Sequence, residues 1–304
     1  MMLKDDIVKR LIENESLFNK IHVIQQNFDI LPNNKKHIGA CIKYQDLYEM
    51  RREFIRELVD SVVDWVYSSE KYKALISTTM RMGKTEGSAN SAVISKAKQK
   101  FRTGTGDQLC IQGQLGELLL FHFIQRQFKA VPLLRKMPIT TSSAHERFGA
   151  DAIHYKIDNG KNILILGEAK TYTSNYKFSA AFEDALNSIL DTYEKHRQEI
   201  NLYLHEDFLD ADMDQVAESY LNGTMENTEV HLVSIVTYNE TNNLKIINQE
   251  DILDQIKKII EERYHAFDNR KIDITNNPIL SRITYIVFPV WNLEKLAKDF
   301  QDLL

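Results

Sequence analysis

The stretch ADAIHYKIDNGKNILILGEAKT, residues 150–171, holds two β-rich runs on either side of an Asn-Gly pair. The runs are Ala150–Ile157 and Asn162–Thr171, and the pair is Asn159 and Gly160. Asn-Gly favours a two-residue hairpin turn, because both central residues of that turn need positive φ. The sequence therefore predicts an antiparallel β-hairpin, around which the rest of the chain can be organised.

The turn also fixes which residues of the hairpin oppose one another. If Asp158 faces Lys161, the acids Asp151 and Glu168 are opposed at the far end. Opposed side chains have Cβ atoms about 4.5–5.5 Å apart, and like charges there destabilise the sheet unless a cation lies between them. Lys170 shares the face of Glu168, because side chains alternate along a strand. The same register pairs Tyr155 with Leu164 and Ile153 with Leu166.

The pattern of Asp151, followed by Glu168 and Lys170, suits the hydrolysis of phosphodiesters. Hard oxygen ligands hold Mg²⁺ or Mn²⁺, the ion polarises the phosphate and lowers the pKa of a bound water, and a lysine places that water or neutralises developing charge. We therefore expect Asp151 and Glu168 to bind the metal and Lys170 to orient the water. The alternative is a surface hairpin with ordinary charged ends.

A third candidate carboxylate, Glu117, lies in the run IQGQLGELLLFHF, residues 111–123. The run is apolar on nearly every side, which predicts a buried helix over roughly 111–129. An acid in such a helix either sits in the first turn, where the helix dipole favours it, or reaches a metal-bound water in the site. The sequence leaves both options open, and in the second Glu117 would serve a second metal or the hydration shell of the first.

Hydrophobic periodicity predicts mainly helix in the first third of the chain and alternating helices and strands after it. Residues 1–105 are expected to form a mostly helical region, with an apolar stripe that includes Phe54, Leu58 and Val62. Residues 106–304 are expected to form an α/β domain. Its elements are a helix at 111–129, strands near 131–141, 150–157 and 162–171, a helix at 178–201, a strand at 229–238, a helix at 249–267, a strand at 282–290 and a helix at 292–300.

Composition limits the classes of protein to which the chain can belong. Its 304 residues are 43% hydrophobic and 27% charged, which is typical of a globular protein rather than a disordered one. The net charge of −5 excludes a general polyanion binder, so nucleic acid would need a local basic surface, a metal or a partner. The start carries acids and no apolar run approaches about 18 residues, so we expect a cytoplasmic protein without a membrane segment. Cys41 and Cys110 are expected to be free thiols.

Charged residues cluster in two further places. Residues 203–229 hold eight acids, which indicates a solvated loop or helix face, with a partner-docking surface or an acidic guard over a basic groove as alternatives. Basic residues recur between positions 84 and 147 and would line a groove for DNA phosphates, although a solvated helix face is the simpler interpretation of each. These candidates are Lys84, Lys96, Lys98, Lys100, Arg102, Arg135, Lys136 and Arg147.

Three histidines lie near the predicted site in sequence. The hairpin register puts His154 on the sheet face away from Asp151, so we assign it to the core or the surface. His122, on the apolar helix, is expected to be a core residue, and His145 is a minor candidate for the site.

The order of helix, three strands, helix and strand, with a helix Glu, a strand Asp and a strand Glu-x-Lys, resembles the PD-(D/E)xK nuclease superfamily. That resemblance implies a restriction-endonuclease-like core, α-β-β-β-α-β, with a mixed sheet flanked by helices. Ala150 stands where the superfamily motif has its proline, a change that removes no metal ligand. Three longer strings resemble the HamA family (DUF1837), the nuclease subunits of the Hachiman antiphage defence system, and they are Gly113–Leu120, Phe148–Asp151 and Leu166–Lys170.

The resemblance, which covers most of the chain, implies a Mg²⁺- or Mn²⁺-dependent DNA endonuclease in a heteromeric complex with a superfamily 2 helicase of the HamB type. In that family the nuclease is held inactive until damaged or phage DNA engages the helicase. Carried over residue by residue, the implied catalytic set is Glu117, Asp151, Glu168 and Lys170, with the three acids as metal ligands.

Two other classes of function compete with this interpretation. One is a non-catalytic DNA-sensing or regulatory subunit of a helicase complex that uses the same fold. The other is a nucleotide hydrolase, suggested by the stretch Arg81–Thr85, which ends in Gly-Lys-Thr. A phosphate-binding loop needs a glycine where Thr78 stands, so the sequence disfavours a nucleotide hydrolase.

Overall fold

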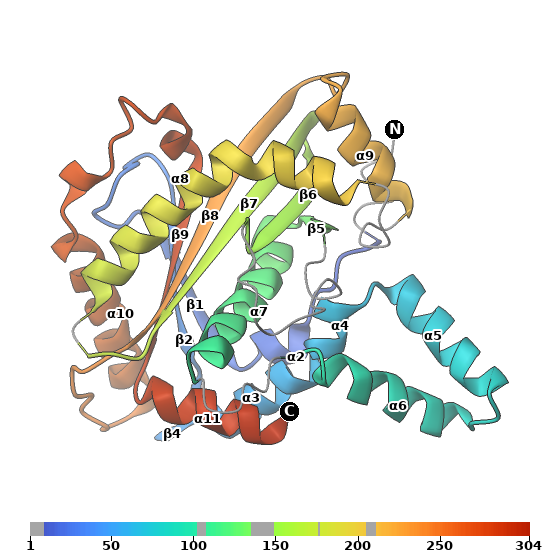
Figure 1. The fold of residues 1–304 in the computed structure, drawn as a ribbon. Coiled ribbons are helices and arrows are strands. Elements are labelled where there is room, and N and C mark those ends of the chain that lie inside the picture. Colours follow the sequence, from blue (N-terminus) through green and yellow to red (C-terminus); the bar gives the residue numbers. More distant parts are fainter. Residues whose placement is uncertain (1–8, 102–107, 135–148, 176, 205–210) are drawn as a thin grey trace.

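The computed structural model describes residues 9–101, 108–134, 149–175, 177–204 and 211–304, and its centre is one seven-stranded mixed sheet (Figure 1). Four neighbouring strands run parallel, and the strands beyond them on either side pair antiparallel with their neighbours. In spatial order the strands are β1 (Ile21–Gln26), β2 (His37–Ile42), β9 (Ile283–Val290), β8 (Thr228–Asn239), β7 (Lys161–Tyr172), β6 (Ala152–Asp158) and β5 (Val131–Leu134). Two short strands, β3 (Tyr44–Gln45) and β4 (Tyr48–Glu49), pair separately.

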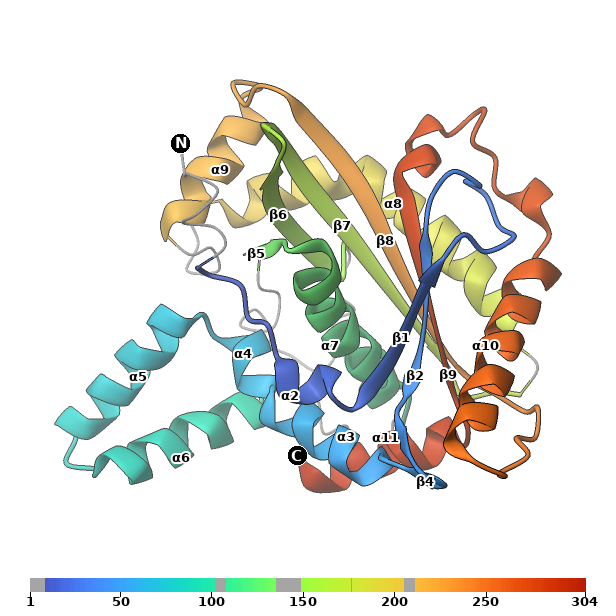
Figure 2. The same ribbon diagram turned by 180° about the vertical axis from the view of Figure 1, so that it is seen from behind.

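Helices cover both faces of the sheet and make a three-layer arrangement (Figures 1 and 2). Each face has its own hydrophobic interior, because successive residues of the central strands point to opposite sides. None of the helices in the described part of the chain is long and apolar enough to cross a membrane. One face carries α2 (Glu15–Phe18), α3 (Arg51–Asp60), α4 (Val62–Val66), α7 (Gln108–Phe128) and α11 (Leu293–Leu303), and the other carries α8 (Phe178–Tyr203), α9 (Ala211–Leu221) and α10 (Gln249–Ala266).

The elements after residue 108 confirm the α/β class and the predicted order of helices and strands. The helix expected at 111–129 is α7, the two hairpin strands are β6 and β7, and the helix expected at 178–201 is α8. The strand expected near 131–141 is described as β5, because residues 135–148 lie outside the described part of the chain. Part of the acidic segment forms α9, which buries Met213, Val216 and Tyr220, so this part is a packed helix and not a loop.

The first hundred residues contain helices, as expected, and also four strands that were not predicted, of which β1 and β2 belong to the main sheet. β2 is buried along its whole length and pairs in parallel with β9 through Ile38 and Gly39. A six-residue apolar run is difficult to assign from sequence when its partner strand comes near the end of the chain. The division predicted near residue 105 therefore does not separate the sheet, since β1 and β2 belong to it.

Two further helices, α5 (Ser69–Arg81) and α6 (Glu86–Lys98), form an arm that projects from the body of the molecule (Figures 1 and 2). No residue of α5 is buried, whereas α6 buries Ala89, Val93 and Ala97. Gly83, in the turn between the helices, has a φ of 93°. A phosphate-binding loop requires a strand before the turn, and here the helix α5 precedes it, so the structure removes that alternative.

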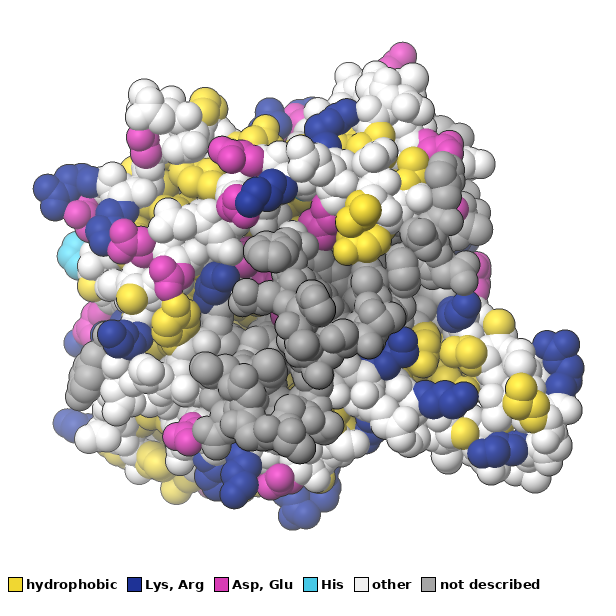
Figure 3. Space-filling model, in the orientation of Figure 1, with side chains coloured by type: hydrophobic (Ala, Val, Ile, Leu, Met, Phe, Trp, Pro, Cys, Tyr) yellow, Lys and Arg dark blue, Asp and Glu magenta, His cyan; other side chains and the backbone are white. Residues whose placement is uncertain are grey.

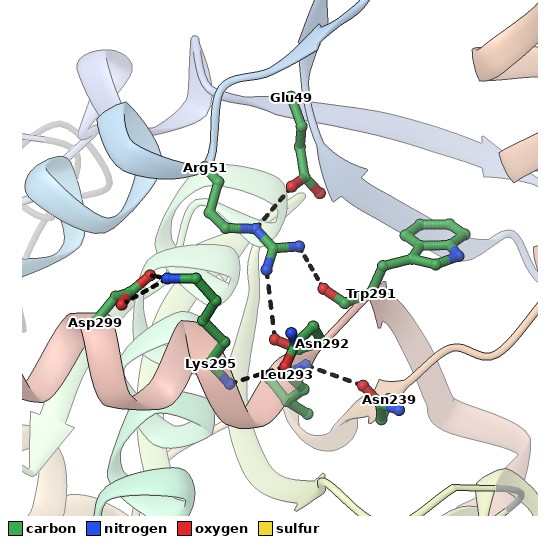
Figure 4. A network of polar contacts seen from close by, with 8 residues as sticks. All are labelled: Glu49, Arg51, Asn239, Trp291, Asn292, Leu293, Lys295 and Asp299. Atoms are coloured by element: carbon green, nitrogen blue, oxygen red, sulfur yellow. Dashed lines mark hydrogen bonds and ion pairs between the residues drawn. The ribbon is translucent and has the colours of Figure 1, made fainter. Parts of the chain in front are cut away.

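Arg51 joins the start of α3 to the junction between β9 and α11 (Figure 4). Its guanidinium donates to the Glu49 carboxylate at 2.7 Å and to the backbone carbonyls of Trp291 and Asn292. Asn292, at a φ of 61°, caps α11 by accepting a hydrogen bond from the Lys295 amide. A pocket of about 640 Å³ opens beside this network, and none of its lining residues belongs to the predicted site. The lining includes Leu47, Tyr48, Arg52, Ile55, Asp302 and Leu303.

Candidate active site at the carboxyl end of β7

The hairpin forms with the predicted turn and the predicted register. Asn159 and Gly160 have φ values of 49° and 75°, as the two-residue turn requires. The paired residues include Asp158 with Lys161 and run to Ala152 with Gly167. Beyond β6, the Asp151 amide still donates to the Gly167 carbonyl at 3.0 Å. Asp151 therefore lies beside β7 next to Gly167 and Glu168.

At this level β6 ends but β7 continues to Tyr172, paired only with β8 on its other side. The edge of β7 next to Asp151 therefore has backbone groups without a neighbouring strand. The Asp151 carboxylate takes the place of that strand, because its Oδ2 accepts a hydrogen bond from the Ala169 amide at 2.8 Å. Asp151 thus lies beside β7 between the positions of Glu168 and Lys170.

A second acid, Glu199 on α8, holds the segment that carries Asp151. Its Oε2 accepts a hydrogen bond from the Ala150 amide at 2.8 Å, and its side chain is buried. Gly149 has a φ of 122°, and a Cβ at that position would lie 2.4 Å from the Glu199 carboxyl carbon. Only glycine therefore allows both this backbone conformation and this contact. Glu199 and Gly149 together fix the backbone conformation directly before Asp151.

Glu168 lies in a polar cluster between β7 and α8, which consists of Glu168, Lys170, Ser188 and Thr192. Its side chain accepts hydrogen bonds from Ser188 Oγ at 2.6 Å and Thr192 Oγ1 at 3.2 Å. Lys170 Nζ donates to Glu168 Oε1 at 3.0 Å and to Ser188 Oγ at 3.1 Å. Glu168 is only 4% exposed, and such donors stabilise a buried carboxyl group. The cluster therefore fixes the position of the Glu168 side chain.

The surroundings of Lys170 keep its ammonium group protonated. Burial alone would lower the pKa of Lys170, but the charge of Glu168, followed by those of Asp151 and Asp184, outweighs burial and raises that pKa above its ordinary value. Lys170 is thus a cation at neutral pH. In this form it can donate hydrogen bonds and stabilise negative charge.

Sequence reasoning missed the polar stripe of α8 that supports the site. Ser188 and Thr192 donate hydrogen bonds to Glu168, and Glu199 accepts one from the Ala150 amide. His196 Nε2 contacts the Tyr220 hydroxyl at 2.5 Å. The spacing of four, four and three residues puts them on one side of the helix, and that periodicity was the available signal. The stripe consists of Ser188, Thr192, His196 and Glu199.

Glu117 does not lie in the first turn of its helix, so that alternative is wrong. α7 begins at Gln108, which puts Glu117 near the middle of the helix, where it is half-buried. At the neighbouring Gly116 the helix approaches Thr171 so closely that an added Cβ would lie 2.4 Å from its Oγ1. Thr171 points to the sheet face opposite Glu168, because residues alternate along β7. In the described part of the chain no three acidic, His or Cys side chains form a metal-binding group.

The donor set still fits a magnesium ion. Mg²⁺ usually keeps several waters and binds one or two carboxylates together with phosphate oxygens of the substrate. Asp151 and Glu168 supply two such carboxylates at adjacent positions beside a protonated lysine. Both carboxylates already accept hydrogen bonds from the protein, and each carboxylate has about four lone-pair sites, so acceptor capacity remains.

The other predicted residues fall into four groups. Lys84, Lys96, Lys98 and Lys100 lie on the arm or directly after it. His154 and His122 are buried on the α7 side of the sheet, where the Phe121 ring packs edge-on against both, in agreement with the core assignment. Cys41 is a buried free thiol, and burial raises its pKa to about 12. Outside the described residues lie Arg102, Arg135, Lys136, His145, Arg147 and the side chain of Cys110.

The family model described as HamA matches residues 15–304 of the chain, which include every residue of the site described above. No curated protein matches the chain.

Proposed function

The chain belongs to the HamA family, whose family model spans nearly all of it, and from this premise we propose that it is a metal-dependent DNA nuclease of the PD-(D/E)xK type. Membership in that family suggests a role in Hachiman antiphage defence. The reaction would be the hydrolysis of DNA phosphodiesters with Mg²⁺ or Mn²⁺ as the cofactor.

The observation that carries the proposal is the meeting of three charged side chains at the carboxyl end of β7. The Asp151 carboxylate bonds the Ala169 amide, and that amide lies between Glu168 and Lys170 in the strand. An Asp from one strand beside a Glu-x-Lys from the next is the superfamily motif. The element order α7, β5, β6, β7, α8 and β8, with α9 inserted before β8, agrees with the expected restriction-endonuclease-like core.

Each residue has a role that its surroundings support. Asp151 and Glu168 would hold the metal, whereas a metal role for Glu117 rests on the family motif alone, because no group of three acids forms among the described residues. A bound divalent ion supplies positive charge to the scissile phosphate and lowers the pKa of water. Lys170, held as an ammonium by Glu168, orients a water by hydrogen bonding and neutralises developing negative charge. Ser188 and Thr192 fix the direction of the Glu168 carboxylate.

The arm of residues 69–98 supplies a surface for the DNA backbone. It contains six Lys or Arg residues and two Glu residues, although the whole chain carries −5. Figure 3 shows Lys and Arg side chains gathered on the arm. Phosphate contacts come from such local clusters and do not depend on net charge. The arm cations are Lys71, Lys73, Arg81, Lys84, Lys96 and Lys98.

The proposed partner is a superfamily 2 helicase of the HamB type, in a heteromeric complex that restrains the nuclease until DNA engages the helicase. The support for this partner is the family membership of the chain. Weak cutting by the isolated chain would then reflect the missing partner and not a missing active site. For that reason the nuclease assay must use the complex.

A non-catalytic, DNA-sensing subunit is the rival function, and one observation favours it. Both oxygens of Glu168 accept hydrogen bonds from hydroxyl groups of α8, as a carboxylate with a structural role would do. A structural Glu168 would matter for folding and not for cutting. Activity and stability must therefore be measured on the same variants.

The deciding experiment is a plasmid-nicking assay on the complex purified with its helicase, with Mg²⁺ or with a chelator. The matched variants are Lys170→Met, in the polar cluster, and Lys195→Met, at an exposed lysine of α8. We expect Mg²⁺-dependent conversion of supercoiled DNA that Lys170→Met abolishes and Lys195→Met retains. Circular dichroism and co-purification with the helicase check that both variants are folded. Equal cutting by both variants would reject the proposed active site.

A further inference from the structure

A second group of charged residues lies at the other end of the central strands, on the α7 side of the sheet. Lys156 on β6 pairs with Ile163 on β7. On its other side, Ile163 pairs with Glu229 on β8. His231 on β8 is beside Ile165. Ile163 and Ile165 belong to the interior under α7, so Lys156, Glu229 and His231 share that face. The polar cluster around Glu168 is on the opposite face and about 23 Å along β7 from Lys161.

Cations from three separate parts of the chain approach this place, because Arg282 directly precedes Ile283, which pairs with Leu232 on β8, and Lys35 lies two residues before β2, which pairs with β9. We call the group the basic cluster: Lys35 from the β1–β2 connection, Lys156 from β6, Lys161 from the start of β7, and Arg282, the last residue of the 3₁₀ helix Pro278–Arg282. Lys35, Lys156 and His231 are half-buried, and Arg282 is exposed. The cluster is thus assembled by the fold and is not a run of neighbouring surface lysines.

The acids within the basic cluster are already engaged. Lys156 pairs with Asp158 at 3.1 Å. Glu229 accepts from Lys161 at 2.6 Å and from His231 at 3.0 Å, so both of its oxygens are used. Among the described residues no carboxylate pairs with Lys35 or Arg282. Four cations therefore face two acids, which leaves a surplus of two positive charges.

The charges of the basic cluster act on the pKa values of Lys35 and His231. Burial, followed by the charges of Arg282 and Lys156, lowers the pKa of Lys35 to about 8. Burial also lowers the pKa of His231, with Lys35 and Lys156 acting in the same direction and Glu229 opposing them. Bringing like charges together in a half-buried place costs free energy. A bound anion would remove that cost.

We propose that the basic cluster binds a phosphate monoester, either on a free nucleotide or at the end of a nucleic-acid strand. A phosphate monoester carries about −1.5 to −2 charges at neutral pH, which matches the surplus of the cluster. The Arg282 guanidinium offers paired donors to phosphate oxygens, and the lysines offer point charges. This site does not depend on the proposed nuclease function, because it shares no residue with the polar cluster or Asp151.

The test measures binding of inorganic phosphate to the full chain by titration calorimetry. The double variant Lys156→Gln/Arg282→Gln removes the surplus charge, and Lys258→Gln/Arg270→Gln removes the same residue types where the side chains are 76% and 91% exposed. We expect the cluster variant to lose at least about tenfold in affinity and the control to lose none. The melting temperature of the cluster variant should not fall, because repulsion is relieved. If that variant does not fold, Lys35→Gln replaces it with the same expectation.

Two further ligands distinguish the sources of the phosphate. Tighter binding of a 5′-phosphorylated oligonucleotide than of the same strand with a 5′-hydroxyl would support a strand end. Tighter binding of a nucleoside monophosphate than of its nucleoside, with no difference between the oligonucleotides, would support a free nucleotide. Either result supports the proposal when the cluster variant abolishes it. Absence of phosphate binding at millimolar concentration, or equal binding by the cluster and control variants, would overturn it.

Discussion

The two faces of β7 differ in chemistry, although their residues alternate along one strand. Toward α7 the strand presents Gly167 and Ala169, which leave room for the helix to pack closely at Gly116 and Leu120. Toward α8, Glu168 and Lys170 enter a hydrogen-bonded network with Ser188 and Thr192. The first face is built for close packing, and the second holds charges in a fixed geometry.

This contrast shows how a site can be positioned without weakening the sheet. The α7 side supplies apolar contact along the middle of the strand, while the α8 side confines its polar groups to the end where β6 has stopped. We therefore expect changes on the α7 side to alter mainly the free energy of unfolding. Changes on the α8 side should alter mainly activity.

The largest effect is expected for Glu168→Gln in the complex. Glutamine keeps one of the two accepting oxygens and places an NH₂ group, which can donate to a hydroxyl oxygen, at the other; it removes the charge that would bind the metal and attract Lys170. Plasmid nicking should fall by about 10²–10³-fold, while the melting temperature changes little. Quantified gel conversion at saturating Mg²⁺ checks the first expectation, and differential scanning fluorimetry checks the second.

The matched control for Glu168→Gln is Glu183→Gln. Glu183 is also on α8 and also pairs with a lysine, Lys271, at 2.6 Å, but it is partly exposed. This variant should cut at the wild-type rate. A wild-type rate for Glu168→Gln as well would mean that the two faces of β7 do not differ in function.

The next effect concerns packing on the α7 face, and Gly167→Val tests it. A Cβ at this position would lie 2.9 Å from Ile124 Cδ1 and Leu120 Cδ2 and 3.0 Å from Ala152 Cβ. The larger valine side chain should lower the free energy of unfolding by about 1–3 kcal/mol. Urea unfolding measures this change, and the fraction of molecules that remains folded should retain metal-dependent nicking.

Gly113→Val provides the control on α7, because among the described residues no side chain and no other segment lies within 4 Å of a Cβ added there. Valine also has a higher helix propensity than glycine, so this variant should be at least as stable as the wild type. Equal destabilisation by both substitutions would show that the close approach at Gly167 is not the cause of the lower free energy of unfolding.

The sequence carried enough information to predict the hairpin side of the site. The Asn-Gly turn fixes the register, and the register alone predicts that Asp151 and Glu168 reach the same level. The same alternation correctly assigned His154 to the other face. These features follow from local chemistry and counting, which is why a single sequence is sufficient.

The rest of the site depends on contacts between segments that are distant in sequence. Ser188, Thr192 and Glu199 are ordinary helix residues until α8 packs over β7, so only their spacing hinted at a shared role. Similarly, β2 is a short buried run whose pairing with β9 joins two ends of the chain. The helical neighbourhood of Glu117 was predicted with a start near residue 111, and α7 starts three residues earlier, at Gln108, which leaves the acid outside the first turn.

An effect that depends on pH is also expected on the α7 face. Burial lowers the pKa of His122 from 6.5 to about 3, and among the described residues neither ring nitrogen has a hydrogen-bond partner. The unfolded chain binds this proton below about pH 6.5 and the folded chain does not. The stability contributed by neutral His122 is therefore complete above pH 6.5 and is lost as the pH falls toward 3. The slope is about 1.4 kcal/mol per pH unit for one such group.

His122→Leu should remove this part of the acid destabilisation, which urea titrations at several pH values between 6.5 and 4 would measure. His265→Leu, at an exposed histidine, serves as the control and should keep the wild-type slope. A wild-type slope in His122→Leu would mean that the buried ring is not the group that takes up the proton.

The smallest effect is expected for Thr192→Val, which removes one hydroxyl from the α8 side without changing the shape of the side chain. Thr192 Oγ1 donates to Glu168 Oε2 at 3.2 Å, and a hydrogen bond of this kind contributes about 1 kcal/mol. If the bond orients the carboxylate toward the metal, its loss should raise the Mg²⁺ concentration for half-maximal nicking about fivefold and leave the maximal rate unchanged. If the hydroxyl instead competes with the metal for that oxygen, the required Mg²⁺ concentration should fall.

Thr237→Val on β8, at a buried threonine distant in sequence from the polar cluster, is the control for the replacement of threonine by valine. The direction of the shift therefore decides whether α8 prepares Glu168 for the metal or withholds it, which stability measurements alone do not distinguish.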